Sequence, residues 1–272
     1  MLAQKISEQL SQPVVVENRP GASTAIATER VATSPADGYT LLLLPSSTSI
    51  LSALRAKLPY DLERDFAPVS RVSTTPLVLI VHPSVPARNV KELIALARSH
   101  PGKLSHASEG VGTAGHLAGE LFKSMAKVDI LHVPYKGGSE ISVAAASGQV
   151  DMGFPDITSA LSLLGKVRWL AVTTEKRSAL KPSIPTLSES GLRGYVRSGW
   201  TGVIVPAGVP KNIIAQLHAV IDKIVNSPET TESLNKLGLE PQASTPEQFA
   251  AFIRSEIAQN TKLIESAKIK VE

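Results

Sequence analysis

The chain has 272 residues, of which 43% are apolar and 19% are charged, so its composition is that of a globular protein and not of a disordered or fibrous one. It contains no cysteine, which excludes disulfides, thiolate zinc sites and cysteine nucleophiles. Its net charge of +4 is spread along the chain and aromatic residues make up only 4%, so we expect no nucleic-acid partner.

The chain opens on the pattern of an amphipathic helix, in which Leu2, Ile6 and Leu10 share one face. The opening residues lack the cationic and apolar regions of a signal peptide, and no apolar run reaches the length of about 18 residues that suggests a membrane span. Because a domain seldom begins inside a helix, we expect that sequence upstream of Met1 is missing.

Short apolar runs then alternate with helical patterns, which predicts an α/β fold with largely parallel sheets. In such sheets ligands collect at the carboxyl ends of the strands. The expected strands are Val14–Glu17, Tyr39–Leu44, Leu77–Val81, Leu104–Ala107, Ile130–Val133, Met152–Phe154, Trp169–Thr173 and Thr201–Val205. The expected helices are Ser23–Ala32, Val90–Ser99, His116–Met125, Glu140–Ser147, Ile157–Leu164, Ile213–Val225 and Thr245–Ala267.

The last of these helices has the clearest start, because Thr245 and Gln248 have the spacing of a capping box around Pro246. No connection in the chain is long enough to be a flexible linker. Two domains would therefore be joined by strands that cross between them, and Leu77–Val81 and Thr201–Val205 are the best candidates.

A glycine-rich turn, Gly110–Gly115, follows one expected strand and opens a helix. The turn matches the G-x-G-x-x-G pattern of a nicotinamide dinucleotide site. Such a site also needs an acidic residue at the end of the next strand, whereas Asp129 precedes that strand. We therefore expect no cofactor. The N–H groups of such a turn suit an anion, either carboxylate or phosphate, and a tight turn without a ligand is the alternative. His116, one turn into the helix, is a candidate to face the anion, although a packing role is the commoner one.

A second candidate anion loop, Pro45–Ser49, follows another expected strand. Its four hydroxyl groups can donate hydrogen bonds to a carboxylate. The same residues could instead form the N-terminal cap of a helix, and the sequence favours neither interpretation.

Other catalytic patterns are weak. The six histidines lack metal-site spacing, and the chain has neither a G-x-S-x-G nucleophile motif nor a Walker A motif. Asp151 and Asp156 flank Phe154 at a strand end, where ligand orientation or helix capping is more plausible than acid–base catalysis. We interpret the remaining histidines, including His106 and His132, as packing or surface residues.

Six stretches taken together carry a family resemblance. They are Pro13–Ala22, Pro35–Leu42, Leu58–Asp61, His116–Phe122, His132–Gly138 and Pro206–Pro210. In these stretches, and in order from about Leu2 to the C-terminus, the chain resembles a Bug-type extracytoplasmic solute receptor, the substrate-binding protein of tripartite tricarboxylate transporters. The resemblance implies a periplasmic-binding-protein type II fold and no catalysis. It also implies that a first strand and its loop, present in family members, are missing from this chain.

The resemblance further implies two α/β lobes around a ligand cleft. Lobe one would be residues 1–78 plus 203–272, and lobe two residues 79–202. The receptor would bind a small carboxylate, such as a di- or tricarboxylate or an acidic amino acid, with high affinity, and it would deliver it to membrane permease subunits. A periplasmic monomer is expected on the same ground. The alternatives are a sensory or interaction protein that uses the same cleft, or an enzyme on a related α/β fold.

The expected ligand-binding residues lie in both candidate loops and at one further strand end. In the segment where many family members have Phe-Asp-Asn, this chain has Phe154, Pro155 and Asp156. Pro155 stands where the first acidic residue of the family usually lies, and Asp156 is the candidate to replace that contact. The full set is Ser46, Ser47, Thr48, Gly112, Thr113, Ala114, His116 and Asp156.

Overall fold

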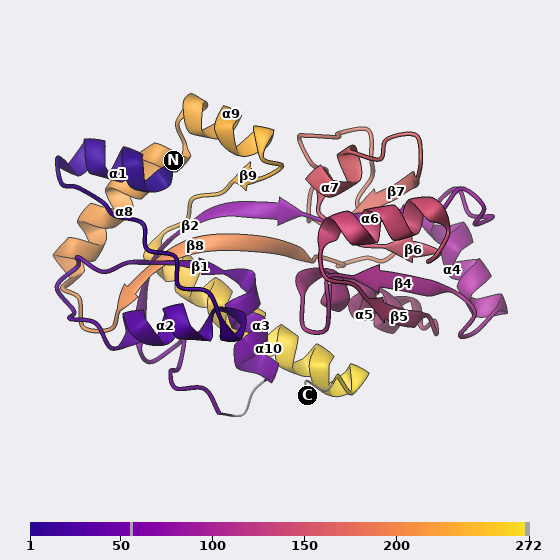
Figure 1. The fold of residues 1–272 in the computed structure, drawn as a ribbon, viewed down its shortest axis with the longest axis horizontal. Coiled ribbons are helices and arrows are strands. Elements are labelled where there is room, and N and C mark those ends of the chain that lie inside the picture. The colour runs from indigo at the N-terminus through magenta and orange to yellow at the C-terminus, as the bar shows by residue number, and fades with distance from the viewer. Residues whose placement is uncertain (55–56, 270–272) are drawn as a thin grey trace. The chain divides into compact units, whose positions relative to one another are not determined.

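The computed structural model describes residues 1–54 and 57–269, which divide into two compact units (Figure 1). Unit 1 comprises Met1–Thr74 and Trp200–Lys262. Unit 2 comprises Thr75–Gly199 and, among the described residues, 263–269.

The chain passes between the units within two long strands, β2 (Phe66–Pro76) and β8 (Ser198–Pro206). We expected the first passage within Leu77–Val81, but β2 begins eleven residues earlier and already contains the boundary after Thr74.

Unit 1 is built on a four-stranded sheet in the order β1-β8-β2-β9, in which β1 pairs antiparallel with β8, and β9 pairs antiparallel with β2. Alternate side chains of β8 enter two apolar clusters. Trp200 and Ile204 lie in one, and Val203 and Val205 lie in the other, so both faces of the strand are buried. The other elements are α1 (Leu2–Leu10), η1 (Ala22–Thr24), α2 (Ala25–Ala32), β1 (Leu42–Pro45), α3 (Ser46–Leu54), α8 (Lys211–Val225), α9 (Pro228–Lys236), β9 (Glu240–Pro241) and α10 (Pro246–Ala267).

Helix α10 packs against β8 through Phe249, which is fully buried. A Cβ atom at Gly202 would lie 2.2 Å from the Phe249 Cζ atom, so this close approach requires glycine. The start of α10 is the expected capping box, because the Gln248 N–H donates to Thr245 Oγ1 at 3.2 Å and the Thr245 N–H donates to Gln248 Oε1 at 3.0 Å.

Unit 2 is built on a five-stranded sheet in the order β5-β4-β6-β3-β7. Strands β4, β5 and β6 are parallel, whereas β3 is antiparallel to both of its neighbours, β6 and β7. The expectation of largely parallel sheets is therefore wrong for β1 and β9 of unit 1 and for β3. In unit 2 the parallel strands β4, β5 and β6 each follow a helix, as a parallel crossover requires, whereas β3 follows β2 without one. The elements are β3 (Val78–Val81), α4 (Val90–Ser99), β4 (Ser105–Ser108), α5 (Ala114–Ala126), β5 (Leu131–Pro134), α6 (Gly138–Ser147), β6 (Met152–Gly153), α7 (Ile157–Leu161) and β7 (Arg168–Val172).

Helices cover both faces of the unit 2 sheet. Leu79 and Val81 of β3 join the apolar cluster that contains α4 and α5, whereas Val78 and Ile80 join the cluster that contains α6 and α7. All four side chains are fully buried, which explains why β3 is a continuous apolar run and not an alternating one.

The local predictions fail at several places, which include α9 and β9, for which no element was expected. Residues Val14–Glu17 form no strand, and Val15 and Val16 are exposed. The long strand β2 was not predicted, and the helix α3 was expected only as the alternative to an anion loop, since both segments are rich in serine and threonine and lack a clear apolar period. The α/β class itself is confirmed.

Candidate functional site

In unit 1 the serine-rich segment begins a helix directly after a strand. Ser46, Ser47 and Thr48 form the first turn of α3, which follows β1 without an intervening loop. Thr48 is fully buried, whereas Ser46 and Ser47 are partly exposed. The first backbone N–H groups of a helix have no partner within the helix, so this turn offers both N–H and hydroxyl donors to an anion. The anion loop and the N-terminal cap of a helix, which the sequence left open as alternatives, are thus the same segment.

A strained turn adjoins this helix. Gly21, Ala22 and Thr24 all have positive φ angles, of 126°, 47° and 80°. Such a conformation is costly for alanine and threonine, and it tends to persist where a functional geometry requires it. Thr24 Oγ1 lies 2.9 Å from Thr48 Oγ1, so the turn and α3 share a hydroxyl pair. The sequence analysis missed Thr24, and the only signal for it was the preceding Pro20-Gly21 turn.

In unit 2 the glycine-rich turn lies at the carboxyl end of β4 and caps α5. Thr113 is the N-cap residue, whose Oγ1 accepts a hydrogen bond from the His116 N–H at 3.3 Å and donates one to the Gly110 carbonyl oxygen at 2.8 Å. Gly110 and Gly112 have φ angles of 117° and 79°, which favour glycine. The loop is therefore tied to the helix that it precedes.

His116 fixes this loop through a hydrogen bond with the loop backbone. Its Nδ1 atom accepts a hydrogen bond from the Gly112 N–H at 3.1 Å, and its side chain is buried. That N–H group, which was expected to face an anion, is thus used within the loop. His116 acts here as a positioning residue.

Three histidines from different elements stack beneath the loop. The His116 and His132 ring centroids are 4.0 Å apart, and those of His132 and His106 are 4.9 Å apart. His132 Nε2 lies 2.6 Å from Ser108 Oγ, which also accepts a hydrogen bond from the Gly110 N–H. Gly110 and Gly112 are therefore each connected to the stack by one hydrogen-bond path.

Burial keeps the stacked rings neutral. It lowers the pKa of His116 to about 4 against the opposing charge of Glu120, with His106 and Lys123 adding to the effect. It lowers the pKa of His132 to about 3, aided by His116 and His106. Burial also lowers the pKa of His106. The rings therefore carry no charge at neutral pH.

Glu120 provides the negative charge beside the stack. Burial alone raises its pKa, but the interactions with Lys123 and His106 outweigh burial and bring the pKa to about 2. Lys123 Nζ lies 2.8 Å from Glu120 Oε1. His106 Nε2 lies 3.6 Å and His116 Nε2 3.9 Å from the same oxygen. The carboxylate thus balances Lys123 and faces two imidazole rings.

The two aspartates near β6 make structural contacts. Asp156 is the N-cap of α7, and it accepts hydrogen bonds from the Ser159 N–H at 2.9 Å and from Ser159 Oγ at 2.6 Å. Asp151 accepts hydrogen bonds from the N–H and the hydroxyl of Ser105. Asp156 therefore has a capping role whether or not it also contacts a ligand.

The structure gathers the expected residues into one group in each unit. Ser46, Ser47 and Thr48 share the first turn of α3, and the Gly112–His116 set shares the start of α5. Asp156 lies at the end of β6, which neighbours β4 in the same sheet. Within the described ranges, no group of three or more His, Asp or Glu side chains is arranged to hold a metal ion.

The Thr113 cap gives a direct test of the loop's local structure. Replacing Thr113 with alanine removes the acceptor for the His116 N–H, so we expect the free energy of unfolding to fall by about 0.5–2 kcal/mol. Urea denaturation of the purified variant measures this loss. Thr113→Ser keeps the hydroxyl and should stay within about 0.5 kcal/mol of the wild type. An equal loss in both variants would contradict the capping role.

Comparisons with known proteins agree on one family. Residues 1–269 match the family model described as tripartite tricarboxylate transporter family receptor. The chain is 34% identical to the protein BugT of Bordetella pertussis over 276 residues, which cover 100% of this chain and 85% of that protein.

Two solved structures of similar fold contain carboxylates by their descriptions. Rpa4515 of R. palustris with adipate superposes with a TM-score of 0.82 at 34% identity, covering 99% of this chain and 91% of that one. MatC of Rhodopseudomonas palustris with bound malate gives a TM-score of 0.76 at 29% identity, covering 97% of this chain and 92% of that one. The fold is therefore that of these periplasmic binding proteins.

Proposed function

Because this chain belongs to the tripartite tricarboxylate transporter receptor family, we propose that it binds one small carboxylate and delivers it to the membrane permease of such a transporter. The match over residues 1–269 carries this proposal. The adipate and malate in the similar structures support the choice of a carboxylate.

We assign the carboxylate contacts to the starts of two helices, α3 in unit 1 and α5 in unit 2. Each helix follows a strand directly or through a short loop, and each presents backbone N–H groups together with hydroxyl groups. The positive end of the helix dipole favours an anion at such a position. We further propose that lobe one (residues 1–78 plus 203–272) and lobe two (residues 79–202) close on the ligand, and that closure signals to the permease.

This function is transport and not catalysis. A receptor needs donors that fit the ligand, whereas an enzyme would also need a nucleophile or an acid–base pair, and Asp151 and Asp156 are both engaged in structural hydrogen bonds. We propose that the protein is a monomer. We place it in the periplasm because two similar structures are described as periplasmic. Among the helices of the described segments, none has both the length and the apolar character needed to cross a bilayer.

A thermal-shift screen with small carboxylates tests the proposal. A ligand at 100 times its Kd adds about 2.7 kcal/mol to the free energy of unfolding. At about 2–4 °C per kcal/mol for a chain of this size, we expect Tm to rise by roughly 5–10 °C with the correct acid. The methyl ester of each acid serves as its control and should leave Tm unchanged. A cooperatively melting chain whose Tm responds to none of the acids would contradict the proposal.

A further inference from the structure

The sheet of unit 2 has a second end, which the candidate ligand site does not use. The glycine-rich turn follows β4 and therefore lies at the carboxyl ends of β4 and its parallel neighbour β6. The opposite end gathers the amino ends of β4, β5, β6 and β7 with the carboxyl end of β3, because β3 runs antiparallel to β6 and β7. The segments that meet there, which we call the amino-end face, are residues 82–89, 98–104, 127–130, 148–151 and 165–168.

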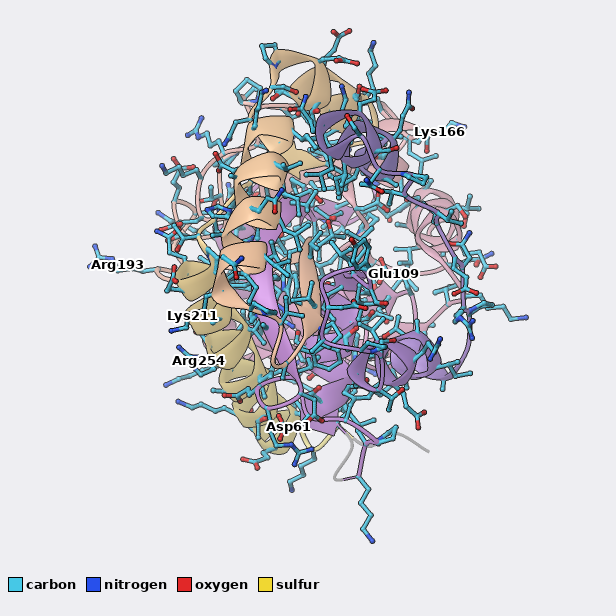
Figure 2. All side chains as sticks on the ribbon, turned by 90° about the vertical axis from the view of Figure 1, so that its left-hand side faces the viewer. Asp61, Glu109, Lys166, Arg193, Lys211 and Arg254 are labelled. Atoms are coloured by element: carbon cyan, nitrogen blue, oxygen red, sulfur yellow. The ribbon has the colours of Figure 1, made fainter. Side chains whose placement is uncertain are left out.

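The amino-end face is basic. Its segments contain six Lys or Arg residues but only two acidic residues, Asp129 and Asp151, so their net charge of +4 equals that of the whole chain. Charged residues are spread along the sequence, and it is the fold that brings these cations together. Figure 2 shows Lys166 extending outward at the outline of the molecule. Four of the cations are exposed and form no ion pair within residues 1–54 and 57–269, namely Arg88, Lys103, Lys127 and Lys166.

A mainly apolar cavity of about 250 Å³ opens on the amino-end face. Lys103 and Asp151 are among its polar lining residues, and Asp151 already accepts two hydrogen bonds within the unit. An apolar side chain with acidic neighbours fits both the cavity and the cations around it. The apolar walls are Val85, Pro86, Leu96 and Leu104.

Hydrogen bonds fix the walls of this cavity. The Arg168 guanidinium donates to the carbonyl oxygens of Val85 and Ala87, at 3.1 and 2.6 Å. The His82 N–H donates to the Asp151 carbonyl oxygen at 2.9 Å. A preformed surface of this kind loses little conformational freedom when it binds a partner. A flat lipid surface could meet the cations but could not fill the cavity, so the concave shape favours a protein segment.

We propose that the amino-end face binds an acidic segment of the transporter's membrane permease, with an apolar side chain of that segment in the cavity. This inference rests on the proposed function, in which the receptor delivers its ligand to a permease. Charge complementarity steers the two proteins together, and the apolar side chain anchors the contact. Docking and ligand binding then use opposite ends of the same sheet.

Fluorescence anisotropy with labelled peptides tests this docking site. The probe is a peptide of two leucines flanked on each side by aspartate and glutamate. One control peptide replaces the leucines with serines, and another replaces the acids with lysines. We expect wild-type protein to bind the probe about tenfold or more tightly than either control peptide. Binding of the probe should weaken as salt is added, because salt screens exposed charges.

Matched variants locate the binding on the amino-end face. Lys103→Glu reverses a charge beside the cavity and should weaken probe binding about tenfold. Lys166→Glu, on a different segment of the face, should act in the same direction. Lys176→Glu replaces an exposed lysine that follows the carboxyl end of β7, and it should bind the probe as wild type does.

The outcomes separate docking from ligand binding. Equal binding of the probe and the serine peptide, or unchanged probe binding in both Lys103→Glu and Lys166→Glu, would overturn the docking site. Binding to vesicles of phosphatidylglycerol and phosphatidylethanolamine without binding of the probe would make the partner a lipid surface, and would also overturn it. Carboxylates should shift the Tm of Lys103→Glu as they shift that of wild type. If no carboxylate shifts the wild-type Tm, the receptor function itself is contradicted, whatever the peptides show.

Discussion

Acidification from pH 7 to pH 4 is expected to remove several kcal/mol of folding stability through the histidine stack. The pKa of an unfolded histidine is about 6.5, whereas burial lowers the pKa of His116 to about 4 and that of His132 to about 3. Between these values the unfolded chain binds protons that the folded chain excludes. The free energy of unfolding therefore falls as the pH drops below about 6.5. For His116 alone the loss is on the order of 3 kcal/mol, at about 1.4 kcal/mol for each pKa unit.

The low pKa of Glu120 acts in the same direction at still lower pH. Its pKa of about 2 lies below the unfolded value, so the stability that it contributes above pH 4.5 is lost as the pH falls toward 2. Denaturant titrations at pH 7, 5.5 and 4.5 measure the slope due to the histidines, and a further titration at pH 3 adds the contribution of Glu120. The charged and titratable groups that face the stack are Glu120, Lys123 and the three histidines themselves.

A histidine variant assigns the slope to the stack. His116→Asn keeps an acceptor for the Gly112 N–H but cannot titrate, so stability should fall less steeply with acid. His100→Asn, which replaces an exposed histidine, should keep the wild-type slope. A wild-type stability that is flat between pH 7 and pH 4.5, or equal slopes in His116→Asn and wild type, would show that the stack does not exclude protons.

Replacing Gly119 with valine is expected to cost about 3 kcal/mol or more, at the upper end of the cost of overpacking a core. A Cβ atom at Gly119 would lie 2.2 Å from His106 Cε1 and 2.5 Å from His106 Nδ1. His106 is fully buried and stacks on His132, so the ring has no space into which it can move. Denaturant unfolding at pH 7 measures the loss.

Two further variants separate the collision from the effect of valine on helix stability. Ser124→Val introduces valine at an exposed position of the same helix, and we expect a change within about 0.5 kcal/mol. His106→Ala frees the space above Gly119, so the double variant should lose less stability than the two single losses added together. Additive losses would mean that Gly119 and His106 do not compete for the same space.

Elements with clear local signals could be predicted from the sequence. Helix α4 spans Val90–Ser99 as expected, because its apolar period is regular and Asn89 caps it by accepting a hydrogen bond from the Glu92 N–H. The capping box at Thr245 is likewise as predicted. In both helices the signals are local and agree with one another, so tertiary context changes little.

Elements whose identity depends on distant partners could not be predicted. The run Val14–Glu17 has strong β propensity but forms no strand, and Val15 is 88% exposed. Strand β2 contains the buried residues Ser70, Ser73 and Thr74. Their hydroxyl groups are satisfied by distant parts of unit 1, as where Ser73 Oγ lies 2.8 Å from Thr201 Oγ1. The β propensity of a residue indicates that it fits a strand, but it does not identify the elements against which that strand packs.

The candidate site could also be predicted only in part. The two loops were found from the sequence because glycine and hydroxyl residues follow apolar strands. The histidine stack was not found, since His106, His116 and His132 come from β4, α5 and β5 and meet only in the folded sheet. His106 and His132 were interpreted singly as packing or surface residues, and both do pack within unit 2.

The most direct test of the receptor function is a calorimetric titration of wild-type protein with the acid that raises Tm most, alongside the methyl ester of that acid. The function predicts saturable binding of one ligand per chain, lost when the carboxylate is esterified, because the helix starts bind its negative charge. Binding that is equally strong for acid and ester, or no saturable heat with any carboxylate, would contradict a carboxylate receptor.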